Sequence, residues 1–170
     1  CPKELYDKTA LRKVYKSSGT MRGDGSFFDP YDGRQDIERR LLRAVGDPME
    51  RLHEDPLRSL RVARFIASLG FSPDDALTEA AQAHADALLD ISRERWLLEI
   101  DKLLLAPRAV DGLRFLARTG LLQRILPEVD GLIGFHEPTT ARHKDLWEHT
   151  LQVLSQTPSD RVLRWTALIH

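Results

Sequence analysis

Two acids and an arginine stand within five residues of one another near the middle of the chain: Glu54, Asp55 and Arg58. A carboxylate only accepts hydrogen bonds and a guanidinium only donates them, so one helical turn would set an acceptor beside a fork of donors. The pairing edges of adenine and cytosine offer an amino donor next to a ring-nitrogen acceptor, whereas uracil and guanine offer a carbonyl next to a ring N–H. An ionised Asp55 beside Arg58 would therefore accept A or C and leave unpaired polar groups with U or G.

The pattern favours a nucleotide selector, but a well-capped surface helix with a solvated charged face would show the same residues. A single helix over 53–71 is predicted to carry them. Asp55 stands where an N-cap belongs, Pro56 suits the first helical position, and Gly70 is the usual left-handed terminator. The apolar face of this helix consists of Leu57, Leu60, Ala63 and Ala67, and its arginine side of Arg58, Arg61 and Arg64.

Apolar spacing and turn signals divide the rest of the chain into short helices. They are expected over 37–45, from the capping signature Ser72-Pro73 to about residue 89, over 92–107, over 109–118, from residue 143, and over 161–170, with a loop at 131–142. A turn at Asp24-Gly25 precedes a short strand at Phe27-Phe28. The expected fold class is all-α, mostly helical, with a small β element near the N-terminus.

Composition narrows the class of protein further. The net charge of −1 argues against a protein whose whole surface is basic and binds nucleic acid, while a local basic stripe stays compatible with RNA binding. The one cysteine, Cys1, excludes an internal disulfide framework and suits the reducing cytoplasm. No apolar run is long enough to span a bilayer. Because the chain begins with Cys1 and ends on His170, we expect it to be part of a longer protein.

The segment EDPLRSLRVARF closely resembles the base-selecting motif of class II tRNA nucleotidyltransferases, the CCA-adding enzymes, and of the related bacterial poly(A) polymerases. The longer phrase RAVGDPMERLHEDPLR resembles the family almost position for position. The resemblance implies that Asp55 and Arg58 pair with the incoming ATP or CTP and that Glu54 orients Arg58. Arg61 would contact phosphate or sugar, or brace the selector.

Two further segments resemble the family's motifs. DPYDGRQD resembles the segment that hinges the catalytic head to the neck, which implies hinge roles for Gly33 and Asp36; Asp36 could equally be the N-cap of the next helix. SRERWLLE resembles the motif that braces the nucleotide-binding helix. Its matching residues are Ser92, Glu94, Arg95 and Glu99. From spacing alone, Ser92 is expected to cap its helix, and Arg95 with Glu99, four residues apart, can form an ion pair worth only a few tenths of a kcal/mol.

The order of these motifs implies a division of the chain. Residues 1–34 would be a remnant of the head with a short β hairpin, 35–105 the neck with the nucleotide-selecting helices, 106–135 a body supporting tRNA, and 136–170 the truncated beginning of an HD-like domain. In the last part WEHTL and RWTALIH resemble the HD pattern, with His149 and His170 as two ligands of an incomplete divalent-metal site.

The resemblance covers roughly 23–170 and omits the D-x-D carboxylates of the head, so the catalytic Mg²⁺ is expected to bind outside this chain. This chain alone is not expected to polymerise. As part of a longer enzyme it would add C and/or A to the 3′ end of tRNA in the cytoplasm, with ATP and CTP as substrates. The alternatives are an HD-type metal-dependent phosphohydrolase and a non-catalytic RNA-binding module.

Overall fold

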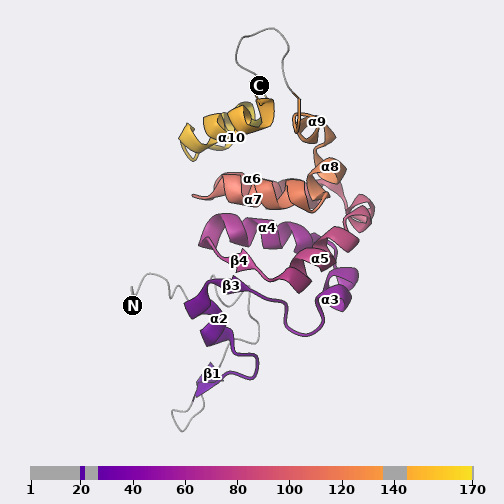
Figure 1. The fold of residues 1–170 in the computed structure, drawn as a ribbon, viewed down its shortest axis with the longest axis vertical. Helices are drawn as coiled ribbons and strands as arrows, with labels where there is room; N and C mark the ends of the chain where they lie inside the picture. Colours follow the sequence, from indigo (N-terminus) through magenta and orange to yellow (C-terminus); the bar gives the residue numbers. More distant parts are fainter. Residues whose placement is uncertain (1–19, 22–26, 136–144, 170) are drawn as a thin grey trace.

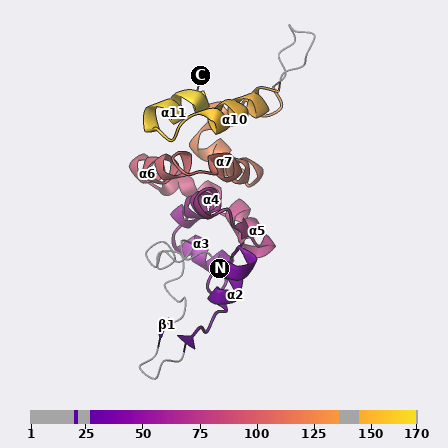
Figure 2. The ribbon, with the colours of Figure 1, turned by 90° about the vertical axis from the view of Figure 1, so that its left-hand side faces the viewer.

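The computed structural model describes residues 20–21, 27–135 and 145–169 of the chain. The described residues form a stack of short helices with two very small sheets, which confirms the mostly helical fold class. Seen from one end of the stack to the other, the helices lie in successive layers (Figures 1 and 2). The helices α3 (Pro48–Glu54) and α5 (Asp75–Ala83) lie below α4 (Leu57–Leu69), α6 (Arg93–Leu104) and α7 (Ala109–Arg118) lie above it, and α10 (Leu146–Gln156) and α11 (Arg161–Ile169) form the last layer.

The first sheet is the expected β element. β2 (Phe27–Phe28) pairs antiparallel with β1 (Thr20–Met21), with Thr20 opposite Phe28. The strand predicted at 27–28 is therefore confirmed, whereas the turn predicted at Asp24-Gly25 lies outside the described residues.

The second sheet replaces a helix that was predicted over 37–45, and that prediction is wrong. α2 (Gly33–Arg39) ends earlier, at Arg40 in a left-handed conformation, and β3 (Leu41–Leu42) then pairs in parallel with β4 (Ser72–Pro73). Backbone hydrogen bonds run from Ser72 N to Arg40 O (2.8 Å) and from Asp74 N to Leu42 O (3.0 Å). Pairing with a distant segment, together with the burial of Leu42, outweighs the local helical spacing.

The same pairing displaces the predicted start of the next helix. Ser72-Pro73 was expected to cap that helix, but it is strand, and the Asp74 side chain caps α5 by accepting from Leu77 N at 2.8 Å. The alanine-rich helix also ends sooner than expected, at Ala83, and is followed by the 3₁₀ helix η2 (Asp86–Asp90).

The core forms around α4. Leu60, Ala63 and Ala67 are completely buried and Leu57 nearly so, which confirms the predicted apolar face of this helix. α4 packs against both α6 and α7. Small side chains let α4 and α7 approach closely: a Cβ added at Gly112 of α7 would lie 2.8 Å from the carbonyl oxygen of Ala63.

Of the remaining helices, α10 packs on α7 and α11 on α6, while α8 (Leu121–Ile125) packs against α7, α9 (Pro127–Asp130) and η2. α8 and α9 follow α7, and α10 and α11 confirm the helices predicted in the last part of the chain. Arg114 of α7 holds Glu148 of α10 through two hydrogen bonds of 2.7 and 2.6 Å. Of the loop predicted at 131–142, residues 131–135 form turns and the rest lies outside the described residues.

Candidate functional site

Asp55 lies at a corner between two helices, so the single helix predicted over 53–71 is wrong. α3 ends at Glu54 and α4 begins at Leu57, with Asp55 in an extended conformation (φ −150°, ψ 93°). The cause is Pro56, because the residue before a proline is sterically displaced from helical backbone angles. The Asp55 side chain caps no helix; its carbonyl oxygen accepts from Arg58 N at 3.0 Å.

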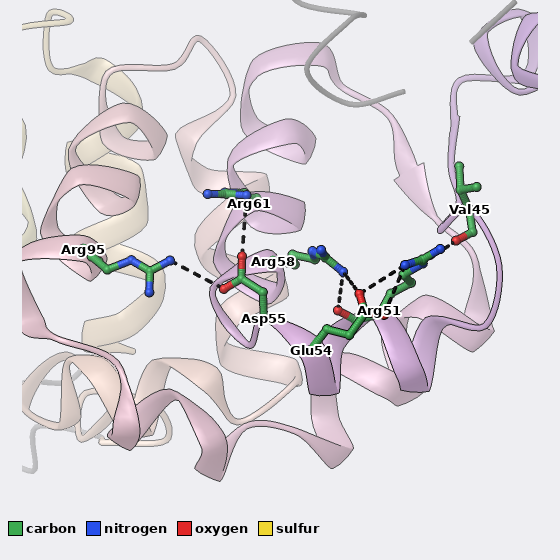
Figure 3. Close-up of polar contacts among 7 residues, drawn as sticks. All are labelled: Val45, Arg51, Glu54, Asp55, Arg58, Arg61 and Arg95. Carbon is green, nitrogen blue, oxygen red and sulfur yellow. Dashed lines mark hydrogen bonds and ion pairs between the residues drawn. The ribbon is translucent and has the colours of Figure 1, made fainter. Parts of the chain in front are cut away.

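On one side of this corner, Glu54 holds Arg58. Nη1 of Arg58 donates to Oε2 of Glu54 at 2.9 Å and to the carbonyl oxygen of Arg51 at 2.7 Å (Figure 3). The Glu54 carboxylate also accepts from the Arg51 side chain. The hydrogen bonds from Arg58, with the larger effect, and from Arg51 lower the pKa of the Glu54 carboxyl below its ordinary value. Since both bonds of Arg58 use Nη1, its Nε and Nη2 donate no hydrogen bond within the described part of the chain.

On the other side, Asp55 faces two arginines (Figure 3). Its Oδ1 lies 3.6 Å from Nη2 of Arg95, and its Oδ2 lies 3.8 Å from Nη1 of Arg61. Both distances are those of ion pairs rather than hydrogen bonds, so the carboxylate keeps its acceptor positions open among the described residues. The ion pair considered between Arg95 and Glu99 does not form among the described residues, because Arg95 pairs with Asp55 instead.

Glu99 lies beneath this corner, with a side chain only 8% exposed. Three cations surround its carboxylate: Arg64 at 3.2 Å, Lys102 at 3.5 Å and Arg61 at 3.9 Å. Arg64 is itself largely buried, which lowers the pKa of its guanidinium, and it lies over the ring of Phe65, 4.5 Å from the ring centroid. Arg61 thus lies between two carboxylates, one on the corner and one on α6.

The three arginines of α4 do not share one side as the sequence predicted. Three residues advance an α-helix by about 300°, so each successive arginine falls about 60° behind the last. Arg58 therefore pairs with α3, whereas Arg61 and Arg64 pair with Glu99 of α6. The structure consequently brings Glu54 to Arg58 and Asp55 to Arg61 and Arg95, as two neighbouring networks.

Sequence reasoning missed Arg51, which lies on α3 three residues before Glu54. Its Nη1 lies 3.2 and 3.1 Å from the two oxygens of Glu54, and its Nε donates to the carbonyl oxygen of Val45 at 3.0 Å. The signal was available, because Asp47-Pro48 is a good helix start and would have placed Arg51 one turn before Glu54. In the structure the Asp47 side chain does cap α3, accepting from Met49 N at 2.9 Å.

The predicted hinge residues lie around α2. The Asp29 side chain accepts a hydrogen bond from the backbone N–H of Gly33, the first residue of α2, at 2.9 Å. Asp36 lies inside the helix and is buried, so the alternative of an N-cap is wrong. Its carboxylate accepts from Nε of Arg43 at 3.0 Å, a hydrogen bond that raises the pKa of Arg43. Arg43 also donates to the carbonyl oxygen of Tyr31 and so ties the start of α2 to β3.

Ser92 and Glu94 form the first turn of α6. Ser92 takes the N-cap position as predicted, although its side chain makes no capping hydrogen bond to the backbone. The pKa of the Glu94 carboxyl is lowered below its ordinary value, chiefly by its own backbone N–H and then by the Ser92 hydroxyl, which both favour the charged form. Both residues thus lie at the start of the helix that carries Arg95 and Glu99.

The predicted metal site of His149 and His170 stays a prediction, because only one of the two ligands lies among the described residues. His149 is half-buried on α10, and His170 lies outside the described residues. Among the described residues no group of three or more His, Cys, Asp or Glu side chains could hold a metal ion. None of the helices in the described ranges is long and apolar enough to cross a lipid bilayer.

Comparison with known proteins identifies the class of molecule that carries this corner. Residues 70–132 match a family model described as the probable RNA and SrmB-binding site of polymerase A. The chain is 40% identical over 175 residues to the multifunctional CCA protein of Alkalilimnicola ehrlichii, a match that covers 98% of this chain and 42% of that protein. It is 39% identical over 155 residues to the CC-adding tRNA nucleotidyltransferase of Thermus thermophilus, with 87% of this chain and 35% of that one covered.

A solved structure agrees with these relatives. The crystal structure of the Bacillus stearothermophilus CCA-adding enzyme in complex with CTP superposes with a TM-score of 0.69 at 33% identity, covering 88% of this chain and 36% of that one. The chain thus spans about two fifths of the length of the multifunctional CCA protein that it matches. Sequence and structure together show that the chain belongs to the class II tRNA nucleotidyltransferase family and corresponds to its neck and body region.

Proposed function

We propose that this chain is the base-selecting and tRNA-supporting part of an enzyme that adds C and/or A nucleotides to the 3′ end of tRNA. The names of its relatives support the reaction class, and the solved relative bound to CTP supports a nucleotide substrate. The family model over 70–132, described as a probable RNA-binding site, supports the second role. In that region exposed cations such as Lys102, Arg108 and Arg118 would contact tRNA phosphates.

The observation that carries the selecting role is that Asp55 and Arg58, three residues apart at one corner, both keep hydrogen-bonding positions unused. The Asp55 carboxylate accepts no hydrogen bond from the described residues, and Arg58 keeps Nε and Nη2 available. A cytosine or adenine would donate its amino group to Asp55 and accept from Arg58 at its ring nitrogen. Uracil or guanine would instead set a carbonyl against the carboxylate and an N–H against the guanidinium.

The surrounding charges would hold these two side chains ready. Glu54 orients Arg58 through the 2.9 Å hydrogen bond. Arg61 and Arg95 lie 3.8 and 3.6 Å from the Asp55 carboxylate without occupying its acceptor positions, and Glu99 anchors Arg61 from α6. A bound base would cover these polar groups, so a base that left them unpaired would be rejected, and selection can be strong without any contact specific to the rest of the nucleotide. Arg61 braces the selector in this arrangement; contact with phosphate or sugar stays a second possibility for the same residue.

The hinge and the metal complete the proposal. The ion pair of the buried Asp36 with Arg43, near Gly33, would hold the junction between this chain and a catalytic head. Mg²⁺ would supply charge stabilisation for the transferred nucleotidyl group from carboxylates outside this chain. A single cysteine and a tRNA substrate support a cytoplasmic location for the protein.

The test is an extension assay with the full-length protein that contains this chain. One tRNA lacks the whole CCA end and another lacks only the last A, and each is offered ATP, CTP, UTP or GTP with magnesium. We expect extension with C or A only. Asp55→Ala and Arg58→Ala should each lower kcat/KM for the correct nucleotide roughly 10- to 100-fold and reduce its preference over UTP or GTP.

A matched control is available on α2. Arg34 and Glu38 form an exposed pair at 3.3 Å with the same four-residue spacing as Glu54 and Arg58. Arg34→Gln and Glu38→Gln should leave nucleotide preference unchanged. The proposal fails if the wild-type protein extends with all four nucleotides, or if Asp55→Ala and Arg58→Ala keep the full preference for A and C.

A further inference from the structure

Arg51 touches every part of the network that orients Arg58. Its side chain contacts both oxygens of Glu54, at 3.2 and 3.1 Å, and its backbone carbonyl accepts from Nη1 of Arg58 at 2.7 Å. Its Nε is in turn anchored on the carbonyl oxygen of Val45, 3.0 Å away in the segment before α3. Figure 3 shows the four groups in a row, from Val45 through Arg51 and Glu54 to Arg58.

Glu54 alone is a weak device for fixing an arginine. Its side chain is 49% exposed, and exposed ion pairs one helical turn apart seldom hold one geometry because side-chain entropy and solvent oppose them. A second guanidinium on the other side of the carboxylate removes that freedom. Arg51 is itself held by the Val45 backbone carbonyl. It therefore fixes the position of Glu54 relative to the backbone, and Glu54 in turn fixes that of Arg58.

We propose that Arg51 is a positioning residue for base selection, acting on Arg58 through Glu54. The inference rests on the proposed function, in which Arg58 reads the base of ATP or CTP. Arg51 touches no nucleotide in this arrangement. It sets the direction in which Nε and Nη2 of Arg58 are presented, and its loss would leave those donors free to turn away.

The side chain of Arg51 can be changed without removing part of the core. It is 46% exposed, and the buried residue of α3 is its neighbour Leu52. A purely structural role would therefore show as a loss of stability that affects all four nucleotides alike. A positioning role would show as a loss of discrimination, with KM for CTP rising more than kcat falls.

The experiment measures kcat/KM for CTP and for UTP with the full-length protein and a tRNA lacking its CCA end. Arg51→Gln should lower the CTP-to-UTP ratio about tenfold. Arg51→Lys should have a smaller effect, because one ammonium can reach either Glu54 or the Val45 carbonyl but cannot reproduce both contacts. The double variant Arg51→Gln/Glu54→Gln should be no worse than Glu54→Gln alone, since both changes remove the same support of Arg58.

Arg34→Gln is the matched control, as it breaks an exposed Arg–Glu pair elsewhere in the chain and should keep the wild-type ratio. The role of Arg51 is overturned if Arg51→Gln keeps the ratio, or if its loss and that of Glu54→Gln multiply in the double variant. Arg58→Ala distinguishes a failure of the proposed function from a failure of the role of Arg51. If Arg58→Ala keeps discrimination, the proposed function itself fails; if it abolishes discrimination while Arg51→Gln does not, only the role of Arg51 fails. Should Arg51→Gln not fold, as seen by circular dichroism, the ratio for Arg51→Lys decides in the same way.

Discussion

The middle and the beginning of one helix, α4, differ in the kind of contacts they make. Along its middle, α4 meets α7 through small and apolar side chains, with Ala63 and Gly112 so close that a methyl group would not fit between them. At its first turn, α4 carries arginines that meet carboxylates from α3 and the corner, most of them between a quarter and a half exposed. The first region is closed to water, and the second is open to a ligand.

The contrast separates stability from recognition. Burial of apolar surface and close packing contribute most of the favourable free energy of folding, whereas a partly exposed ion pair contributes about 0–1 kcal/mol. Substitutions in the seam between α4 and α7 should therefore change the free energy of unfolding and leave the base preference of the folded fraction intact. Substitutions in the corner should do the reverse.

The largest effect is expected from Leu60→Ala. Leu60 is completely buried, and deleting its branched side chain should lower the free energy of unfolding by about 2–5 kcal/mol through lost burial and a residual cavity. Urea denaturation followed by circular dichroism measures the change. Leu98→Ala on α6 is the matched control, because Leu98 is 57% exposed and its loss should cost within about 0.5 kcal/mol. Equal effects at the two positions would contradict the assigned core.

Gly112→Ala tests the close approach of the two helices directly. The added Cβ would lie 2.8 Å from a backbone oxygen and 3.1 Å from the side chains of Ala67 and Leu103, so the helices must move apart. Gly131→Ala is the control, since there the new methyl group meets only ordinary contacts of 3.5 Å and the backbone is right-handed (φ −61°). By thermal denaturation, Gly112→Ala should be less stable than Gly131→Ala by about 1–3 kcal/mol. If the two variants melt at the same temperature, α4 and α7 do not pack as closely as the contact at Gly112 requires.

The seam was largely predictable from the sequence, because the spacing of Leu57, Leu60, Ala63 and Ala67 is local information. The strand pair of Leu41-Leu42 with Ser72-Pro73 was not. It depends on segments about 30 residues apart, and each segment by itself favours a helix or a helix start. The corner at Asp55 lies between these cases, because the effect of Pro56 on its preceding residue was readable but was outweighed by a capping pattern.

For the candidate site, residue types and motif matches pointed to Glu54, Asp55, Arg58 and Arg61 before any geometry was known. Their partners could not be assigned in the same way. Arg95 pairs with Asp55, 40 residues away in the sequence, rather than with the nearby Glu99. Pairing across helices is set by how α6 packs on α4, which helical periodicity does not encode.

Arg95→Gln should affect recognition far more than stability. The Arg95 side chain is 49% exposed and its partner Asp55 24%, so the free energy of unfolding should change by no more than about 0.5 kcal/mol. Without Arg95, Asp55 keeps one ion pair, to Arg61, and should hold its orientation less well. We expect a loss of CTP-over-UTP preference of roughly 3- to 10-fold in the extension assay. Unchanged preference would remove Arg95 from the selector and leave it as a surface arginine.

The smallest effect, and the most direct view of the corner, is the titration of Glu54. Hydrogen bonds from Arg58 and then Arg51 hold the pKa of this carboxyl below its ordinary value of 4.5. A carboxyl whose pKa is lower in the folded state stabilises the fold above its ordinary pKa, and this contribution is lost as the pH falls through the lowered value. The side-chain carboxyl signal of Glu54, followed by NMR, should therefore titrate below 4.5 in the wild-type chain. Its midpoint should rise in Arg58→Gln and, by less, in Arg51→Gln, because the bond from Arg58 has the larger effect. A wild-type midpoint at or above the ordinary value would mean that Glu54 does not hold Arg58 in solution. Nε and Nη2 of Arg58 would then have no fixed orientation for reading a base.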